Sequence, residues 1–173
     1  METAIGIWTE VAARPGLESR HYLQAWTFLR QAGRVPDPDQ AKRVLGVILE
    51  MPIDGAHDVL VAYEDGSSRY LNHSGQVAIL DDVSMENIQQ AIQAWLQIGR
   101  FLVEDIGPWE RPQLPELPPG HVRIMILTPS GPHFGQGPQQ QVMADRAANA
   151  FIQSATALLQ LIVPITLGKP MPN

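Results

Sequence analysis

Apolar and polar residues alternate most clearly in the stretch 44–80, which two turn signals divide into short segments. The dipeptide Asp65-Gly66 favours a two-residue hairpin loop, because a type I′ turn needs positive φ at both central positions. The stretch 72–75 ends in glycine and suits a second turn. The continuous apolar run 44–49 has the length and composition of a strand that is covered on both faces. The pattern therefore predicts four consecutive antiparallel strands, a β-meander over 44–80.

The two turns also predict which residues of the meander lie opposite each other. A two-residue loop at Asp65-Gly66 pairs Val61 with Tyr70, and a three-residue loop at 73–75 pairs Tyr70 with Ala78. One face then carries Val59, Val61, Tyr63, Tyr70, Ala78 and Leu80, and the other carries Leu60, Ala62, Leu71, Val77 and Ile79. Both faces are apolar, whereas a meander with one solvated face is polar on that side. We therefore expect helices on both sides of the sheet, or a second copy of the chain, to cover the second face.

Apolar residues recur at helical spacing in the segments 17–32, 85–106 and 139–163, and each segment predicts a helix. Ser84 is expected to cap the second helix, and Pro164 is expected to end the third. The final turns of the third helix are apolar nearly all round, which indicates that they are deeply buried or touch a partner.

Alternation over 121–128 predicts a fifth strand, and a crossover through the preceding helix places it beside the first strand. A proline-rich connector at 108–120, expected to be extended, leads into this strand. The predicted fold class is α+β: a five-stranded, mainly antiparallel sheet of meander 44–80 plus strand 121–128, in the order 5-1-2-3-4, packed with three helices. Residues 1–173 are expected to form this single domain, because the length suits one core.

The composition excludes several classes of functional site. The chain has no cysteine, which excludes disulfides, thiolate zinc sites, iron–sulfur clusters and cysteine nucleophiles. The first residues lack the basic and long apolar regions of a secretory signal. The longest apolar stretch, 155–167, is interrupted by Gln160 and Pro164 and falls short of the ~20 residues that span a bilayer. We therefore expect a soluble, cytoplasmic protein that does not contact a membrane.

Acidic side chains are concentrated in the middle of the chain. Residues 44–110 hold eleven acidic and two basic side chains, in a chain whose net charge is −6. This segment would repel a phosphate backbone and no basic stripe offsets it, so nucleic-acid binding is not expected. The same segment leaves one further hypothesis open, an inhibitor or immunity-type protein that binds a basic partner.

The strongest candidate for a ligand site is the glycine-rich stretch 129–138, expected to be a loop between the fifth strand and the third helix. Backbone N–H groups at a helix start can hold an anion, and glycines let a ligand approach the backbone. The candidate ligand-binding residues are Ser130, Gly131, His133, Phe134, Gly135 and Gly137, with His133 as the candidate acid or base. Their spacing matches neither a dinucleotide fingerprint nor a P-loop. A connector that only turns the chain is the competing interpretation, and the commoner one.

Other residues of the types found in catalytic or metal sites are explained more simply by structural roles. His73 and Ser74 are adjacent, but no nucleophile-elbow motif surrounds the serine, which also suits a turn. His57, His73 and His121 can gather at one end of the sheet with Asp58, but no two of the five histidines have the i, i+4 spacing of a helical metal pair. No metal site and no cofactor are predicted.

Two classes of function follow from these patterns, and no motif decides whether the chain is an enzyme. The first is a non-enzymatic protein-binding module that self-associates as a homodimer, because the doubly apolar meander and the apolar end of the last helix need cover. The second is a small-ligand-binding protein or an enzyme with its site at 129–138. The oligomeric state, and the effect of His133 substitution on ligand binding, distinguish the two.

Overall fold

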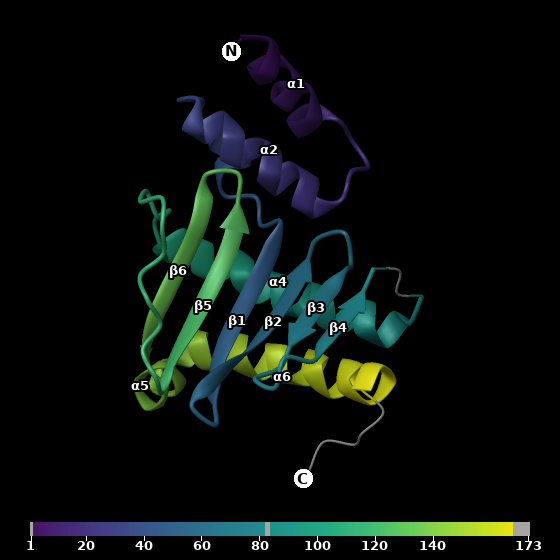
Figure 1. Cartoon of the computed structure of the whole chain (residues 1–173), viewed down its shortest axis with the longest axis vertical. Helices are drawn as coiled ribbons and strands as arrows, with labels where there is room; N and C mark the ends of the chain where they lie inside the picture. Colours follow the sequence, from purple (N-terminus) through teal and green to yellow (C-terminus); the bar gives the residue numbers. More distant parts are fainter. Residues whose placement is uncertain (1, 82–83, 168–173) are drawn as a thin grey trace.

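Figure 1 shows the computed structural model of the chain, in which six antiparallel strands form one sheet. The structure describes residues 2–81 and 84–167. The strands are β1 (Gly46–Ile53), β2 (Ala56–Tyr63), β3 (Ser68–Leu71), β4 (Val77–Leu80), β5 (His121–Thr128) and β6 (Gly131–Pro138). Their order in the sheet is β4-β3-β2-β1-β5-β6. The predicted α+β class with an antiparallel sheet is therefore confirmed, and the predicted order 5-1-2-3-4 lies within the observed one.

The helices occupy two places around the sheet (Figure 1). They are α1 (Glu2–Ala13), α2 (Ser19–Gln31), α3 (Pro38–Ala41), α4 (Glu86–Asp105), α5 (Gln139–Ala144) and α6 (Arg146–Leu167). α1 and α2 form a hairpin beyond one end of the strands, whereas α4 and α6 cross one face of the sheet. α1 has no counterpart among the predicted helices.

The core lies between the sheet and the helices α4 and α6. Successive side chains of a strand point to opposite faces, so every second strand residue reaches these helices. Trp95 of α4 packs edge-on against Phe151 of α6, with ring centroids 5.2 Å apart. Around this pair are the buried residues Val47, Leu60, Ala62, Ile92, Ile126, Leu158 and Ile162. Over Arg146–Ile165, α6 is long and apolar enough to cross a bilayer by length and composition alone, whereas the sequence pattern predicted no stretch of that length. About a third of this span is buried, and its packing in the core is compatible with a soluble protein.

The stretch 129–138 is not the predicted loop, because most of it forms the strand β6. β6 pairs with β5 over its whole length, with Gly135 opposite Ile124 and Gly137 opposite Val122. Glycine and proline are depleted in strands, so the local sequence favours a loop, but pairing with an apolar neighbouring strand overrides that preference. The sheet therefore has six strands rather than five, and a hairpin takes the place of the predicted strand-to-helix loop.

The first hairpin of the meander has a different register from the predicted one. The Tyr63 N–H donates to the Ser67 carbonyl at 2.9 Å, so the loop holds three residues rather than two. Gly66 has a φ of +86°, as expected for the last residue of a three-residue loop with a bulge. Leu60 consequently pairs with Tyr70. This shift of one residue exchanges the faces of β2 relative to β3.

Among the residues that the structure describes, helices cover one face of the sheet and not the other (Figure 1). The second turn of the meander agrees with the prediction, since Leu71 lies opposite Val77. The corrected register places Leu60, Ala62, Tyr70, Ala78 and Leu80 on the helix-covered face. The other face, which we call the open face, carries Val59, Val61, Leu71, Val77 and Ile79. The expectation of helices on both faces is wrong, and a second copy of the chain on the open face stays a prediction.

Three helix ends differ from the predicted ones. Met85 rather than Ser84 precedes α4, and no side chain caps it. Asp145 is extended between α5 and α6, and its Oδ1 accepts the Ala148 N–H at 2.8 Å, so the predicted third helix is two helices. Pro164 lies inside the last turn of α6, where the loss of one backbone donor does not end the helix.

Candidate functional site

The β5–β6 hairpin brings two of the predicted site residues together. His133 Nε2 lies 3.0 Å from Ser130 Oγ and 3.2 Å from Thr128 Oγ1. His133 Nδ1 lies 2.6 Å from the carbonyl oxygen of Ile106, the residue that follows α4. The imidazole is fully buried and links the hairpin turn to the end of α4.

The hydrogen bonds of His133 show which ring nitrogen must carry a proton. A carbonyl oxygen can only accept, so Nδ1 carries a proton; when the ring is neutral, Nε2 is the acceptor for the Ser130 hydroxyl. The Thr128 hydroxyl is oriented by donating to the Gly131 carbonyl at 2.9 Å. Burial lowers the pKa of His133, although the hydrogen bond to Ile106 acts in the opposite direction. Serine and imidazole have the spacing of a nucleophile and its base, but a base without exposed surface belongs to a structural network.

Of the other four predicted residues, Gly131 joins this network through its carbonyl, whereas Phe134, Gly135 and Gly137 do not. Gly131 begins β6 with a φ of +126°. Phe134 lies on the open face against the Trp109 ring, with centroids 5.1 Å apart. Gly135 is exposed, and Gly137 lies beside α5. None of the six predicted residues lines either of the two cavities described below, so ligand binding at this hairpin stays a prediction.

The proline-rich connector covers the β5–β6 end of the open face. The Trp109 N–H donates to the Pro132 carbonyl at 2.8 Å, which holds the connector beside β6. Arg123 of β5 donates to the Pro115 carbonyl and also pairs with Glu50 of β1 at 3.2 Å. The arginine and the carboxylate are largely buried, so this part of the open face is closed and its charges are paired.

The β3–β4 end of the open face is uncovered. Leu71 of β3 and Val77 and Ile79 of the edge strand β4 are 42%, 52% and 58% exposed, and we call these three side chains the open-face patch. Arg69 lies beside the patch on β3, is buried, and donates to Asp81. A contiguous apolar surface on an edge strand is a typical mark of an interaction site.

The histidines and the acid expected at one end of the sheet meet only in part. The backbone N–H and the Nδ1 of His73 lie 2.7 Å and 2.9 Å from Asp58 Oδ1, and the Tyr70 hydroxyl donates to Asp58 Oδ2. His57 points to the opposite face from Asp58, and His121 lies at the start of β5. Within residues 2–81 and 84–167, no group of three His, Cys, Asp or Glu side chains is placed to hold a metal ion.

Tyr70 is absent from the predicted sites because the predicted register puts it on the face opposite Asp58. The observed three-residue loop brings the two side chains to the same face, where both are buried. Burial and the hydrogen bond to Asp58 raise the pKa of Tyr70 well above its usual value, so the hydroxyl keeps its proton. The sequence contains a signal for this loop, because Gly66 suits the last position of a three-residue loop as well as the second position of a two-residue one.

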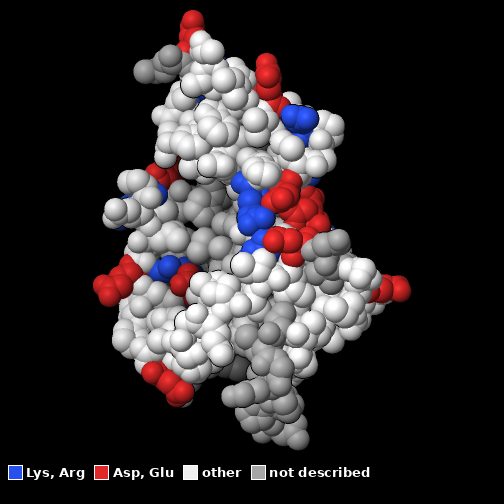
Figure 2. All heavy atoms as spheres, turned by 45° about the vertical axis from the view of Figure 1, so that its right-hand side comes forward, with Lys and Arg blue, Asp and Glu red and all other residues white. Residues whose placement is uncertain are grey.

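A cleft of about 690 Å³ lies between the α1–α2 hairpin and the adjoining end of the sheet. Tyr22 and Trp26 of α2 line it, together with Arg34 and Arg43. Figure 2 shows basic and acidic side chains side by side at this junction, and Arg43 pairs with Glu64 at 2.7 Å. Mixed charge of this kind does not make the cleft a phosphate-binding surface.

No family model, no curated protein and no solved structure matches this chain. Three features of the structure bear on its function. The hairpin network around His133 is closed to solvent, the open-face patch is exposed, and the Asp58 cluster lies on the helix-covered face.

Proposed function

We propose that this chain is a non-enzymatic protein-binding module that self-associates as a homodimer through the open face of its sheet. The observation that carries the proposal is the open-face patch, whose three apolar side chains are 42–58% exposed on β3 and the edge strand β4. Covering them with a protein surface removes apolar area from water, which is the main favourable term in association. A ligand site at 129–138 has less support, because its candidate base His133 has no exposed surface.

A second copy of the chain suits this face better than a charged partner does. The chain carries a net charge of −6, but Arg123 on the open face pairs with Glu50, and Arg69 pairs with Asp81. Because these charges are neutralised within the chain, they do not make the face repel its own copy. A two-fold dimer buries the same patch on both copies, and two sheets that stack face to face interdigitate their side chains about 10 Å apart.

Sedimentation velocity on the full chain tests the proposal. We expect a dimer at concentrations of about 10 to 100 µM, the range in which an interface worth about 6 to 8 kcal/mol is populated. Because the contact is apolar, raising the salt concentration should leave the dimer intact, since salt screens charges between exposed groups only. A monomer at every concentration would contradict the proposal. An assembly that salt dissociates would contradict it as well, and would favour contacts made by the acidic segment.

A further inference from the structure

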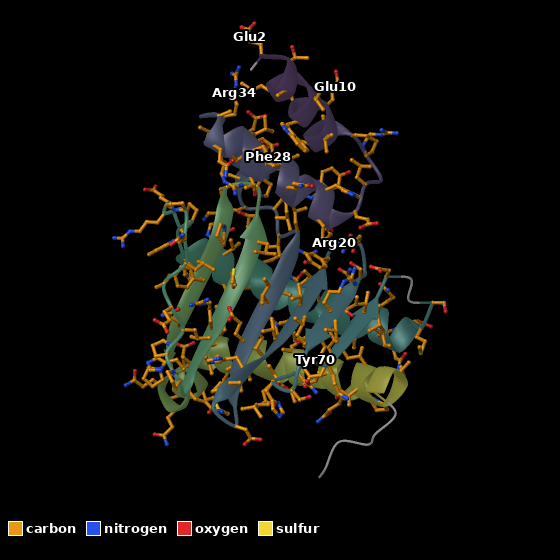
Figure 3. The ribbon with its side chains drawn as sticks, in the orientation of Figure 1. Glu2, Glu10, Arg20, Phe28, Arg34 and Tyr70 are labelled. Carbon is orange, nitrogen blue, oxygen red and sulfur yellow. The ribbon has the colours of Figure 1, made fainter. Side chains whose placement is uncertain are left out.

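A cavity of about 180 Å³ lies between the helix-covered face of the sheet and α6. Its apolar walls are Leu49, Met51, Ile53, Leu60, Ala155 and Leu159. Its polar lining consists of Asp58 of β2, Tyr70 of β3 and Thr156 of α6. Tyr70 lies on the part of the sheet next to α6 (Figure 3). The cavity is on the side of the sheet opposite the open-face patch.

The carboxylate of Asp58 is buried without a permanently charged partner. Only 7% of the residue is exposed, and a buried carboxylate is costly unless it is paired and hydrogen-bonded. Its three donors are the His73 backbone N–H, the His73 imidazole and the Tyr70 hydroxyl. In the described part of the chain, His73 is the only basic side chain that pairs with it. The site therefore favours a cation.

The polar groups in the cavity lining can accept hydrogen bonds from an ammonium group. A carboxylate has about four lone-pair directions, and three are used by the donors named above. The Thr156 hydroxyl donates to the Ile152 carbonyl at 2.9 Å, which leaves its oxygen free to accept. The Tyr70 oxygen likewise can accept, because its own proton is given to Asp58. Three acceptors from three elements thus belong to the lining of an otherwise apolar cavity.

The volume of the cavity limits the size of the apolar part of a ligand. A cavity of about 150 Å³ lined by aliphatic and aromatic side chains is enough to bind benzene, and this cavity is of the same order. We propose that it binds a small primary amine with an apolar tail about the size of one aromatic ring. The ammonium group lies against Asp58 and the tail lies among the leucines of β1, β2 and α6. The proposal does not depend on self-association, because that uses the other face of the sheet.

A ligand series on the full-length wild-type chain tests the charge preference. Benzylamine, benzyl alcohol and benzoate share a ring and differ in the group attached to it, and each is titrated while chemical shifts and thermal unfolding are recorded. We expect benzylamine to bind about tenfold more tightly than benzyl alcohol, because a charge-assisted hydrogen bond is about twice as strong as a neutral one. Benzoate should not bind. Equal binding of amine and alcohol, or no binding of the amine, would overturn the proposal.

Two pairs of variants test the location. Leu159→Trp fills the cavity and should abolish benzylamine binding, whereas Gln160→Trp, on the exposed side of α6, should leave it unchanged. Asp58→Asn removes the charge but keeps an acceptor, so the amine should lose its advantage over the alcohol. Asp105→Asn removes an exposed carboxylate outside the cavity and serves as its control. Unchanged amine binding in Leu159→Trp would overturn the assignment even if Asp58→Asn fails to fold.

Discussion

Substituting Ile79 by threonine should weaken self-association by an amount that follows from its exposure. Ile79 is the most exposed member of the open-face patch, at 58%. Full burial of an isoleucine contributes about 1.5 to 3 kcal/mol, so covering its exposed part contributes about 1 to 1.7 kcal/mol in each copy. A two-fold dimer contains the residue twice, so we expect a loss of about 2 to 3 kcal/mol, or roughly a 30- to 150-fold rise in the Kd of the dimer.

Sedimentation equilibrium of the wild type and Ile79→Thr measures this change. Threonine is β-branched, so it keeps the strand preference of β4. The matched control is Phe101→Gln on α4, because Phe101 is 68% exposed and α4 packs on the helix-covered side of the sheet. Urea unfolding of the dissociated variants should give free energies within about 0.5 kcal/mol of the wild type, as for most substitutions of exposed residues.

Two results would refute this reasoning. A dimer Kd that Ile79→Thr leaves unchanged would show that the open-face patch lies outside the interface. A larger rise in Kd from Phe101→Gln than from Ile79→Thr would place the interface on α4 instead. Either outcome would show that the patch is exposed to solvent but does not form the dimer interface.

Two further predictions concern the fold. Gly99→Ala should lower the free energy of unfolding by about 1 kcal/mol in urea titrations, because the added Cβ would lie 2.7 Å from Cγ1 of the buried Val47. Overpacking of this kind costs about 1 to 3 kcal/mol, which outweighs a helix-propensity gain of about 1 kcal/mol. A more stable variant would contradict this close contact. Because burial lowers the pKa of His133, the unfolded state binds more protons below about pH 6.5, so stability should fall as pH is lowered through that range. Thermal unfolding of His133→Gln should show a shallower dependence on pH, and parallel profiles would mean that another group titrates.

The elements that the sequence predicts well are those specified by neighbouring residues. The second turn of the meander forms at 72–75 as expected, because Asn72 Oδ1 accepts from the Ser74 and Gln76 backbone N–H groups within the same turn. The end of α2 near Gly33, where φ is +78°, is equally local. Strand β5 and the long helix α4 have clear periodic patterns, and their order in the chain leaves few ways to place them.

The sequence of the first turn of the meander is compatible with a two-residue or a three-residue loop. A contact with a residue far away in the sequence accompanies the observed three-residue loop. Asp65 Oδ2 accepts the Ser19 N–H at the start of α2, at 2.7 Å, while Oδ1 accepts the Ser67 N–H at 2.9 Å. The dipeptide Asp65-Gly66 fits two-residue and three-residue loops alike, so local chemistry does not select the register. The bond to Ser19 joins residues far apart in the sequence and has no signature in the turn itself.

The candidate sites depended on such distant contacts even more strongly. The stretch 129–138 has the composition of a loop, and only pairing with β5 makes it a strand that buries His133. The sequence allows Asp58 and His73 to lie at the same end of the sheet but predicts no site there, and their partner Tyr70 follows from the register alone. The cavity beside them needs α6, which the sequence predicts as a helix without saying where it packs.

By itself, the sequence determined the α+β class, the antiparallel meander and the neighbours of β1, because turn chemistry and the periods of strands and helices act within a few residues. The tertiary structure decided the sixth strand, the register of the first hairpin and the face on which each apolar residue lies. The physical reason is that a register shift of one residue costs little locally but turns every following side chain to the other face. Packing against α4 and α6 and the bond between Asp65 and Ser19 both belong to the observed arrangement, which leaves the open-face patch exposed and brings Tyr70 to Asp58.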